Sequence, residues 1–179
     1  GVKTVVVATD GIGGGADTML RDLPADIAAV SVSGKNQTIG TLNNANQAFG
    51  IIDVQAAKAA ELTVTLDNTA RTTGKLNVTT LQVRDNDSDL NDKSAVTTLN
   101  IVSNGVRNTT NAIGSVEADG VSTFNLLGTQ DLAVKIDQAA HTQGNVNGFT
   151  NLVVDGSTAE GNLKVTMNAA VINALHGQS

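Results

Sequence analysis

The chain has 179 residues, a formal net charge of −6 and no cysteine. The absence of cysteine excludes disulfides and thiolate metal sites, and the acidic balance argues against binding to nucleic acid or to anionic lipid. No apolar run approaches the roughly 18 residues of a membrane-spanning helix, so we expect no membrane insertion. Because the chain has three Phe and no Trp or Tyr, its core must be aliphatic, which suits stacked strands better than a sandwich around a buried Trp.

A six-residue pattern recurs along the chain, with apolar residues at its first, fourth and sixth places and small polar residues between them. The copies are Val2–Val7, Ile27–Val32, Phe49–Val54, Val78–Val83, Val96–Ile101, Val121–Leu126 and Phe149–Val154. Each copy has the length of a β-strand, and its fourth and sixth places fall on one face by two-residue alternation. The intervals between copies vary, which favours a stack of short strands joined by loops of variable length.

A second type of strand alternates apolar and polar residues without interruption. It is predicted at Leu62–Leu66, Leu132–Ile136 and Leu163–Met167. Such strands have one buried and one solvated face. The short link Gly128–Asp131 between two predicted strands could be a hairpin as easily as a corner between stacked strands. We therefore predict an all-β fold, a parallel β-helix or β-solenoid-like stack, with an antiparallel β-sandwich as the alternative.

Helix signals are few. Short helices are predicted at Asp17–Leu23, Asn44–Ala48, Val54–Glu61 and Met167–Leu175, and Ala169–Leu175 could instead form one more strand. We expect residues 1–179 to form a single domain. Since the chain begins and ends within strand-like or turn-like sequence, we also expect it to be a fragment of a larger protein.

The two strand types in succession carry a family resemblance. Thr98-Leu99-Asn100-Ile101 and Thr123-Phe124-Asn125-Leu126, together with Leu132–Ile136 and Leu163–Met167, resemble the strand repeats of type I-secreted, calcium-dependent surface-layer (S-layer) proteins and RTX-class adhesins of Gram-negative bacteria. The match covers residues 76–176 well and the first half loosely. The resemblance implies a β-solenoid, an extracellular location at the bacterial cell surface, and a place in a surface lattice or an adhesin stalk. It implies as partners neighbouring domains of the same chain, like subunits and cell-surface polysaccharide.

The densest charge cluster runs from Arg84 to Lys93. Its carboxylates are Asp85, Asp87, Asp89 and Asp92. The D-x-D-x-D spacing resembles the opening of a calcium loop, and hard cations need six to eight oxygen ligands. Leu90 and Val96 stand where an EF-hand requires Gly and Glu, so this is no EF-hand. The cluster predicts either a partial Ca²⁺ site or a solvated acidic loop in which Arg84 and Lys93 reduce repulsion.

A second calcium candidate lies in the segment Ile12–Leu20. Gly13, Gly15, Asp17 and Met19 match the nonapeptide calcium turn of the same family, but Ile12 replaces its first Gly. The alternative is a glycine-rich turn in which Asp17 caps a short helix.

Other polar residues are interpreted structurally. Asp119, Asp137 and Asp155 are expected in turns, and His141 and His176 on the surface. Only three Glu are present, and with so few aromatic residues we expect no enzyme, a polysaccharide-active β-helix being the less favoured reading. A flat threonine array of the ice-binding kind is not favoured either, because in the pairs Thr79-Thr80 and Thr97-Thr98 one residue should turn inward.

Overall fold

The computed structural model describes residues 3–9, 17–34, 47–55, 57–69, 74–84, 94–106, 109–118, 120–137 and 152–167. Within these ranges the protein is all-β, as predicted, and contains no helix. The strands are β1 (Thr4–Thr9), β2 (Thr18–Arg21), β3 (Ala29–Gly34), β4 (Gln47–Gln55), β5 (Glu61–Asn68), β6 (Gly74–Arg84), β7 (Thr98–Gly105), β8 (Thr109–Ala118), β9 (Thr123–Gly128), β10 (Asp131–Ile136), β11 (Val153–Asp155) and β12 (Leu163–Met167).

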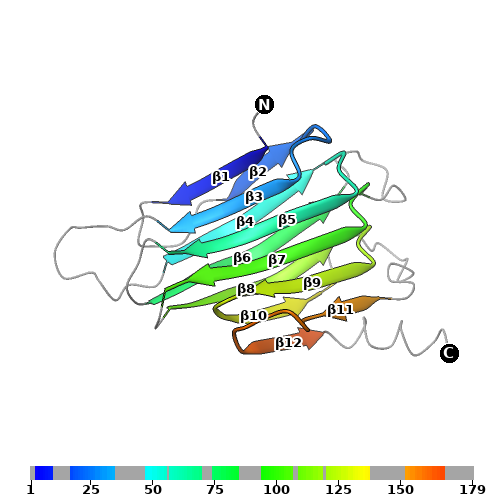
Figure 1. Ribbon diagram of the computed structural model, residues 1–179. Coiled ribbons are helices and arrows are strands. Elements are labelled where there is room, and N and C mark those ends of the chain that lie inside the picture. Colours follow the sequence, from blue (N-terminus) through cyan, green and yellow to red (C-terminus); the bar gives the residue numbers. More distant parts are fainter. Residues whose placement is uncertain are drawn as a thin grey trace.

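Successive strands alternate between two six-stranded sheets (Figure 1). Sheet A has the order β1-β3-β5-β7-β9-β11, and sheet B has the order β2-β4-β6-β8-β10-β12. We call each consecutive pair of strands, one in each sheet, a rung; the first rung is β1 with β2 and the last is β11 with β12. All pairings between the described strands are parallel. The antiparallel alternative is therefore wrong for this part of the chain.

The link Gly128–Asp131 is a corner and not a hairpin. It joins β9 in sheet A to β10 in sheet B, and these strands are not paired with each other. The corner is tight because Gly128 has a φ of 110° and packs against the backbone of Ser103 in the rung above. Only glycine adopts such a φ readily, so this residue allows the chain to cross from one sheet to the other in so few residues.

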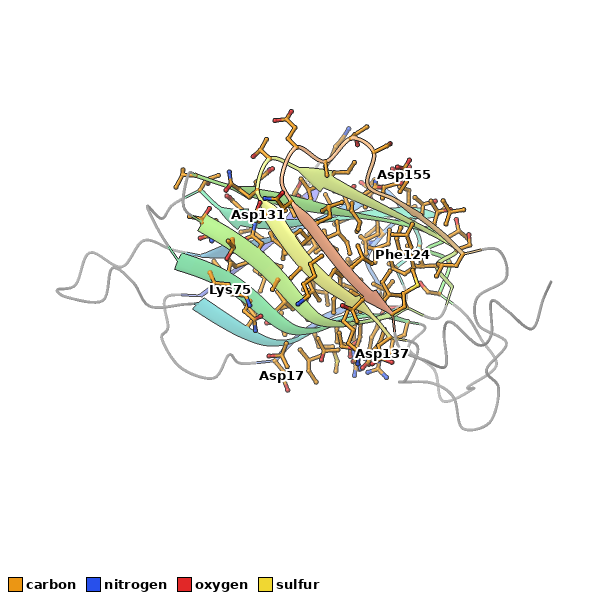
Figure 2. All side chains as sticks on the ribbon, turned by 90° about the horizontal axis from the view of Figure 1, so that it is seen from below. Asp17, Lys75, Phe124, Asp131, Asp137 and Asp155 are labelled. Atoms are coloured by element: carbon orange, nitrogen blue, oxygen red, sulfur yellow. The ribbon has the colours of Figure 1, made fainter. Side chains whose placement is uncertain are left out.

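The core lies between the two sheets and consists of aliphatic columns that run from rung to rung. One column of sheet B passes through Thr18, Ile52, Leu81, Val116, Ile136 and Met167. One column of sheet A passes through Val5, Val30, Val64, Ile101 and Leu126. Phe124 is fully buried and lies among the side chains that fill the space between the sheets (Figure 2). In-register stacking thus gives most apolar residues of these two columns an apolar neighbour in the adjacent rung.

The six-residue pattern marks a bend as well as a strand. In the copy at Val96–Ile101, the first, fourth and sixth residues are all buried. Thr97 and Thr98 form the bend between them, and their N–H groups both donate to the Ala60 carbonyl at 2.8 and 3.1 Å. Neither threonine is buried. The prediction that one residue of each pair turns inward is wrong, because the bend turns both away from the core.

The same bend is stacked over three rungs inside sheet B. There, three four-residue segments lie in register, each with a buried apolar residue at its first and last position and two less buried residues between them. The segments are Phe49–Ile52, Val78–Leu81 and Ile113–Val116. The stack ends at β10, where the register shifts between Val134 and Ile136. That strand alternates strictly, as its sequence predicts. The pattern therefore marks a bulge-like step where two residues separate the buried apolar ones.

The helix predictions are wrong wherever the structure can test them. Thr18–Arg21 form β2, and Val54–Gln55 end β4. Gln47 and Ala48 begin β4, whereas residues 44–46 and 168–175 lie outside the described part of the chain. Pairing with a neighbouring strand outweighs the weak helix propensity of these short segments.

Candidate functional site

The acidic cluster lies outside the described residues. Asp85, Asp87, Asp89 and Asp92 belong to residues 85–93, which connect the end of β6 in sheet B to the residues that precede β7 in sheet A. Their role in calcium binding thus stays a prediction. The flanking Arg84 is described, and its guanidinium is directed at Asp53.

Asp17 stabilises a strand bend. It does not cap a helix, because the next residues form β2. Its Oδ1 accepts a hydrogen bond from the Ile51 N–H at 2.8 Å, and Ile51 lies in the bend of β4. The carboxylate satisfies a main-chain donor that the regular ladder leaves free at this bend. One carboxylate oxygen is thereby used within the protein.

An ion pair between a buried carboxylate and a partly exposed guanidinium lies on the outward face of sheet B. The side chain of Asp53 is 6% exposed, and Arg84 donates to both of its oxygens, from Nε at 3.0 Å and from a terminal nitrogen at 2.6 Å. Gln55 donates a further hydrogen bond to Oδ2 at 2.6 Å. Such a two-pronged contact fixes the relative position of β4 and β6. Asp53 and Arg84 are 31 residues apart, so no local spacing in the sequence signals this pair.

A row of amide side chains lies on the outward face of sheet A. Thr63, Asn100 and Asn125 occupy one column across β5, β7 and β9. Asn125 Nδ2 donates to Asn100 Oδ1 at 2.8 Å, and Asn100 Nδ2 donates to Thr63 Oγ1 at 3.2 Å and Glu61 Oε1 at 2.6 Å. The row links three rungs through side chains, in addition to the main-chain ladder.

Asp155 ends β11 and begins the turn that follows it. Its Oδ1 accepts the Ser157 N–H at 2.8 Å, which is the Asx-turn geometry expected from the sequence. This backbone hydrogen bond, followed by one from the Ser157 side chain, lowers the pKa of Asp155 below its ordinary value of 3.8. Asp137 instead forms an ion pair with Lys135, while Asp119, His141 and His176 lie outside the described residues.

The four terminal strands carry the exposed apolar side chains. Among the described residues, the large hydrophobic side chains that are most exposed are Val6 at 62%, Met19 at 50%, Val153 at 50% and Val165 at 39%. They lie on β1, β2, β11 and β12 respectively, one on each strand. Each of these strands is paired on one side only among the described strands. Both ends of the stack therefore combine unpaired main-chain groups with exposed aliphatic surface, which the sequence pattern alone did not locate.

The described residues contain no group of three or more acidic or histidine side chains placed to hold a metal ion. They also contain no helix that is long and apolar enough to cross a membrane. The architecture defines an all-β protein of two parallel six-stranded sheets. No family model matches the chain, and no curated protein or solved structure matches it.

Proposed function

We propose that this chain is a β-solenoid-like structural segment of a secreted bacterial cell-surface protein, and that it serves as a component of an S-layer lattice. The observation that carries the proposal is the exposed aliphatic side chain on each of the four terminal strands. Terminal strands of a parallel sheet are a template for further strand pairing. Because the terminal strands at both described ends of the stack can each pair with one more strand, this segment is suited to stacking on other copies of itself.

The direction of the strands favours stacking of one copy upon another. All strands within a sheet run the same way, so the last rung of one copy can pair with the first rung of the next by translation, and every pairing stays parallel. The inward face of sheet B then continues, because β12, with Val165 and Met167, would pair with β2, with Thr18 and Leu20, of the next copy. Contacts of this head-to-tail kind do not close on themselves and generate filaments.

Calcium is the second part of the proposal. Asp85, Asp87, Asp89 and Asp92 would bind Ca²⁺ on the connection between the two sheets and make that loop rigid. Asp17, whose Oδ1 accepts the Ile51 N–H, would contribute a ligand through its remaining carboxylate lone pairs. An extracellular site of this type acts at millimolar Ca²⁺, a concentration that suits the cell surface. Neighbouring domains and cell-surface polysaccharide are the other expected partners.

Assembly is tested by sedimentation velocity over a series of protein concentrations, with Ca²⁺ and with a chelator. We expect a series of oligomers whose size increases with protein concentration. Val165→Lys places a charge in the inward column at the open end and should leave the protein monomeric. Thr166→Lys is the matched control, since it adds the same charge to the exposed, outward side of the same strand. A wild-type protein that stays monomeric, or two variants that behave alike, would contradict the proposal.

The calcium part has its own readout. Ca²⁺ that binds the native state raises the melting temperature, by an amount that grows with its concentration. We expect this rise in the wild type and its loss when Asp85, Asp87 and Asp89 are all changed to Asn. If titration calorimetry with Ca²⁺ gives no heat and the melting temperature does not change, calcium binding is excluded. The proposed stacking of copies would not be affected by that result.

A further inference from the structure

A polar cluster interrupts the aliphatic core at one corner between the sheets. Here β5 and β7 end and β6 and β8 begin. The buried side chains are Asn68, Ser103, Thr109 and Asn111, none more than 3% exposed. Asn111 stands between Leu76 and Leu132 in its column, and Ser103 follows Leu66 in another. Polar residues thus occupy places that leucine fills in adjacent rungs.

The donors in this cluster are all engaged. Asn111 Nδ2 lies 2.9 Å from Ser103 Oγ, 3.0 Å from the Asn104 carbonyl and 3.3 Å from the Leu66 carbonyl. Asn68 Nδ2 donates to the carbonyls of Thr110 and Gly74 at 3.3 and 3.4 Å. These carbonyl acceptors fix the orientation of both amides, since an exchange of oxygen and nitrogen would bring oxygen against oxygen.

The hydroxyl groups are engaged in the same way. Ser103 Oγ donates to the Asp131 carbonyl at 3.2 Å, and Thr109 Oγ1 donates to the Val106 carbonyl at 2.7 Å. No hydroxyl proton of the cluster remains for the two amide oxygens. Asn68 Oδ1 and Asn111 Oδ1 are both fully buried and have no hydrogen-bond partner among the described residues. Such orphaned acceptors are costly in a core and are normally satisfied by an internal water.

The two side chains interlock. The Asn68 amide reaches the carbonyl of Thr110, which precedes Asn111, while the Asn111 amide reaches the carbonyl of Leu66, two residues before Asn68. Each side chain therefore points into the strand that carries the other. The two unpartnered oxygens belong to one corner, which joins the third rung (β5 with β6) to the fourth (β7 with β8).

We infer that this corner is a binding site for an internal water molecule that donates hydrogen bonds to Asn68 Oδ1 and Asn111 Oδ1. Water has two donors for these two acceptors. A cation is disfavoured because the described side chains of the cluster are all neutral, and a buried charge without a compensating carboxylate is expensive. The nearby carboxylates are used elsewhere: Asp67 accepts from Thr69, and Asp131 accepts from Asn162.

The test is a crystal structure of the wild-type chain at a resolution that orders internal waters. We expect a density peak about 2.7–3.2 Å from both amide oxygens, with no anomalous signal in crystals grown with Ca²⁺ or Rb⁺. A dry corner would overturn the inference, and so would a peak with anomalous signal, which would identify a cation.

Water–amide NOE spectroscopy provides the solution readout. Cross-peaks from water to the Asn68 and Asn111 side-chain NH₂ groups should have the sign of a long-lived bound water, whereas those of the exposed Asn162 should have the sign of fast exchange. In Asn111→Leu, which extends the leucine column, the Asn68 cross-peak should lose the bound-water sign. If the wild-type amides behave like Asn162, the site is not hydrated. The wild-type measurement stands whether or not the variant folds.

Discussion

Gly128 combines a positive φ with a close approach to the backbone of the adjacent rung. Its φ is 110°, and a Cβ built there would lie 2.2 Å from the Ser103 carbonyl oxygen. Gly128→Ala should lower the free energy of unfolding by about 2–4 kcal/mol, because it adds left-handed strain to a clash with rigid backbone. Urea denaturation measures the loss. The control is Thr129→Ala at the exposed neighbouring position, which should change stability by less than about 0.5 kcal/mol; equal effects would show that the corner can relax.

Asp155 gives a pH dependence whose sign follows from its hydrogen bonds. The Ser157 N–H, and then the Ser157 hydroxyl, lower its pKa in the folded state below 3.8. The ionised form is thus favoured by folding: its contribution is fully present above the ordinary pKa and is lost as pH falls through the folded pKa. NMR titration should place the Asp155 carboxyl below 3.8, and Ser157→Ala should return it part of the way. An unchanged titration in Ser157→Ala would assign the whole effect to the main-chain donor.

At the scale of the strand, Asp53 and Arg84 hold β4 against β6. Arg84→Ala leaves a carboxylate that is 6% exposed, with Gln55 as its remaining side-chain donor among the described residues. We expect a loss of about 2–4 kcal/mol in the free energy of unfolding, because a buried charge loses its partner. Thermal and urea denaturation provide the measurement.

Two further variants separate charge from packing at this pair. Lys58→Ala removes an exposed cation and should be nearly neutral. The double variant Asp53→Asn with Arg84→Met removes both charges and should be more stable than Arg84→Ala alone. If it is equally unstable, the Arg84 side chain acts through packing.

Strands whose apolar and polar residues alternate without interruption can be predicted from the sequence. The alternation of Leu62–Leu66 and Leu132–Ile136 was sufficient to predict β5 and β10. β8 was not predicted, because Asn111 replaces an apolar residue and Gly114-Ser115 interrupt its alternation. Gly114 is required there, since a Cβ would lie 2.8 Å from the Thr79 carbonyl oxygen of the adjacent strand. A bend of this kind depends on the neighbouring rung, and a single strand's sequence cannot reveal it.

At the scale of the whole molecule, the described strands of each rung pair only with strands of the rungs beside it. Stability should therefore decrease from the centre of the stack to its ends. Hydrogen exchange of the monomeric protein should show the slowest amides in β5, β6, β7 and β8, and much faster exchange in β1, β2, β11 and β12. Uniform protection in all strands would indicate that the ends are covered. Protection that rises at the terminal strands with protein concentration would instead locate the stacking contacts proposed above.

The sequence by itself determined the all-β class, the aliphatic core and most strands, because two-residue alternation and the scarcity of Pro and aromatic residues act locally. It also predicted the turn at Asp155. Only the tertiary structure decided that the strands divide between two parallel sheets, that Thr97 and Thr98 face away from the core, and that Asp53 meets Arg84. The same holds for Asn68 and Asn111, whose side chains lie at one corner and whose amide oxygens have no partner among the described residues. These features depend on which residues face each other in adjacent rungs, and that register is set by contacts between residues far apart in the chain.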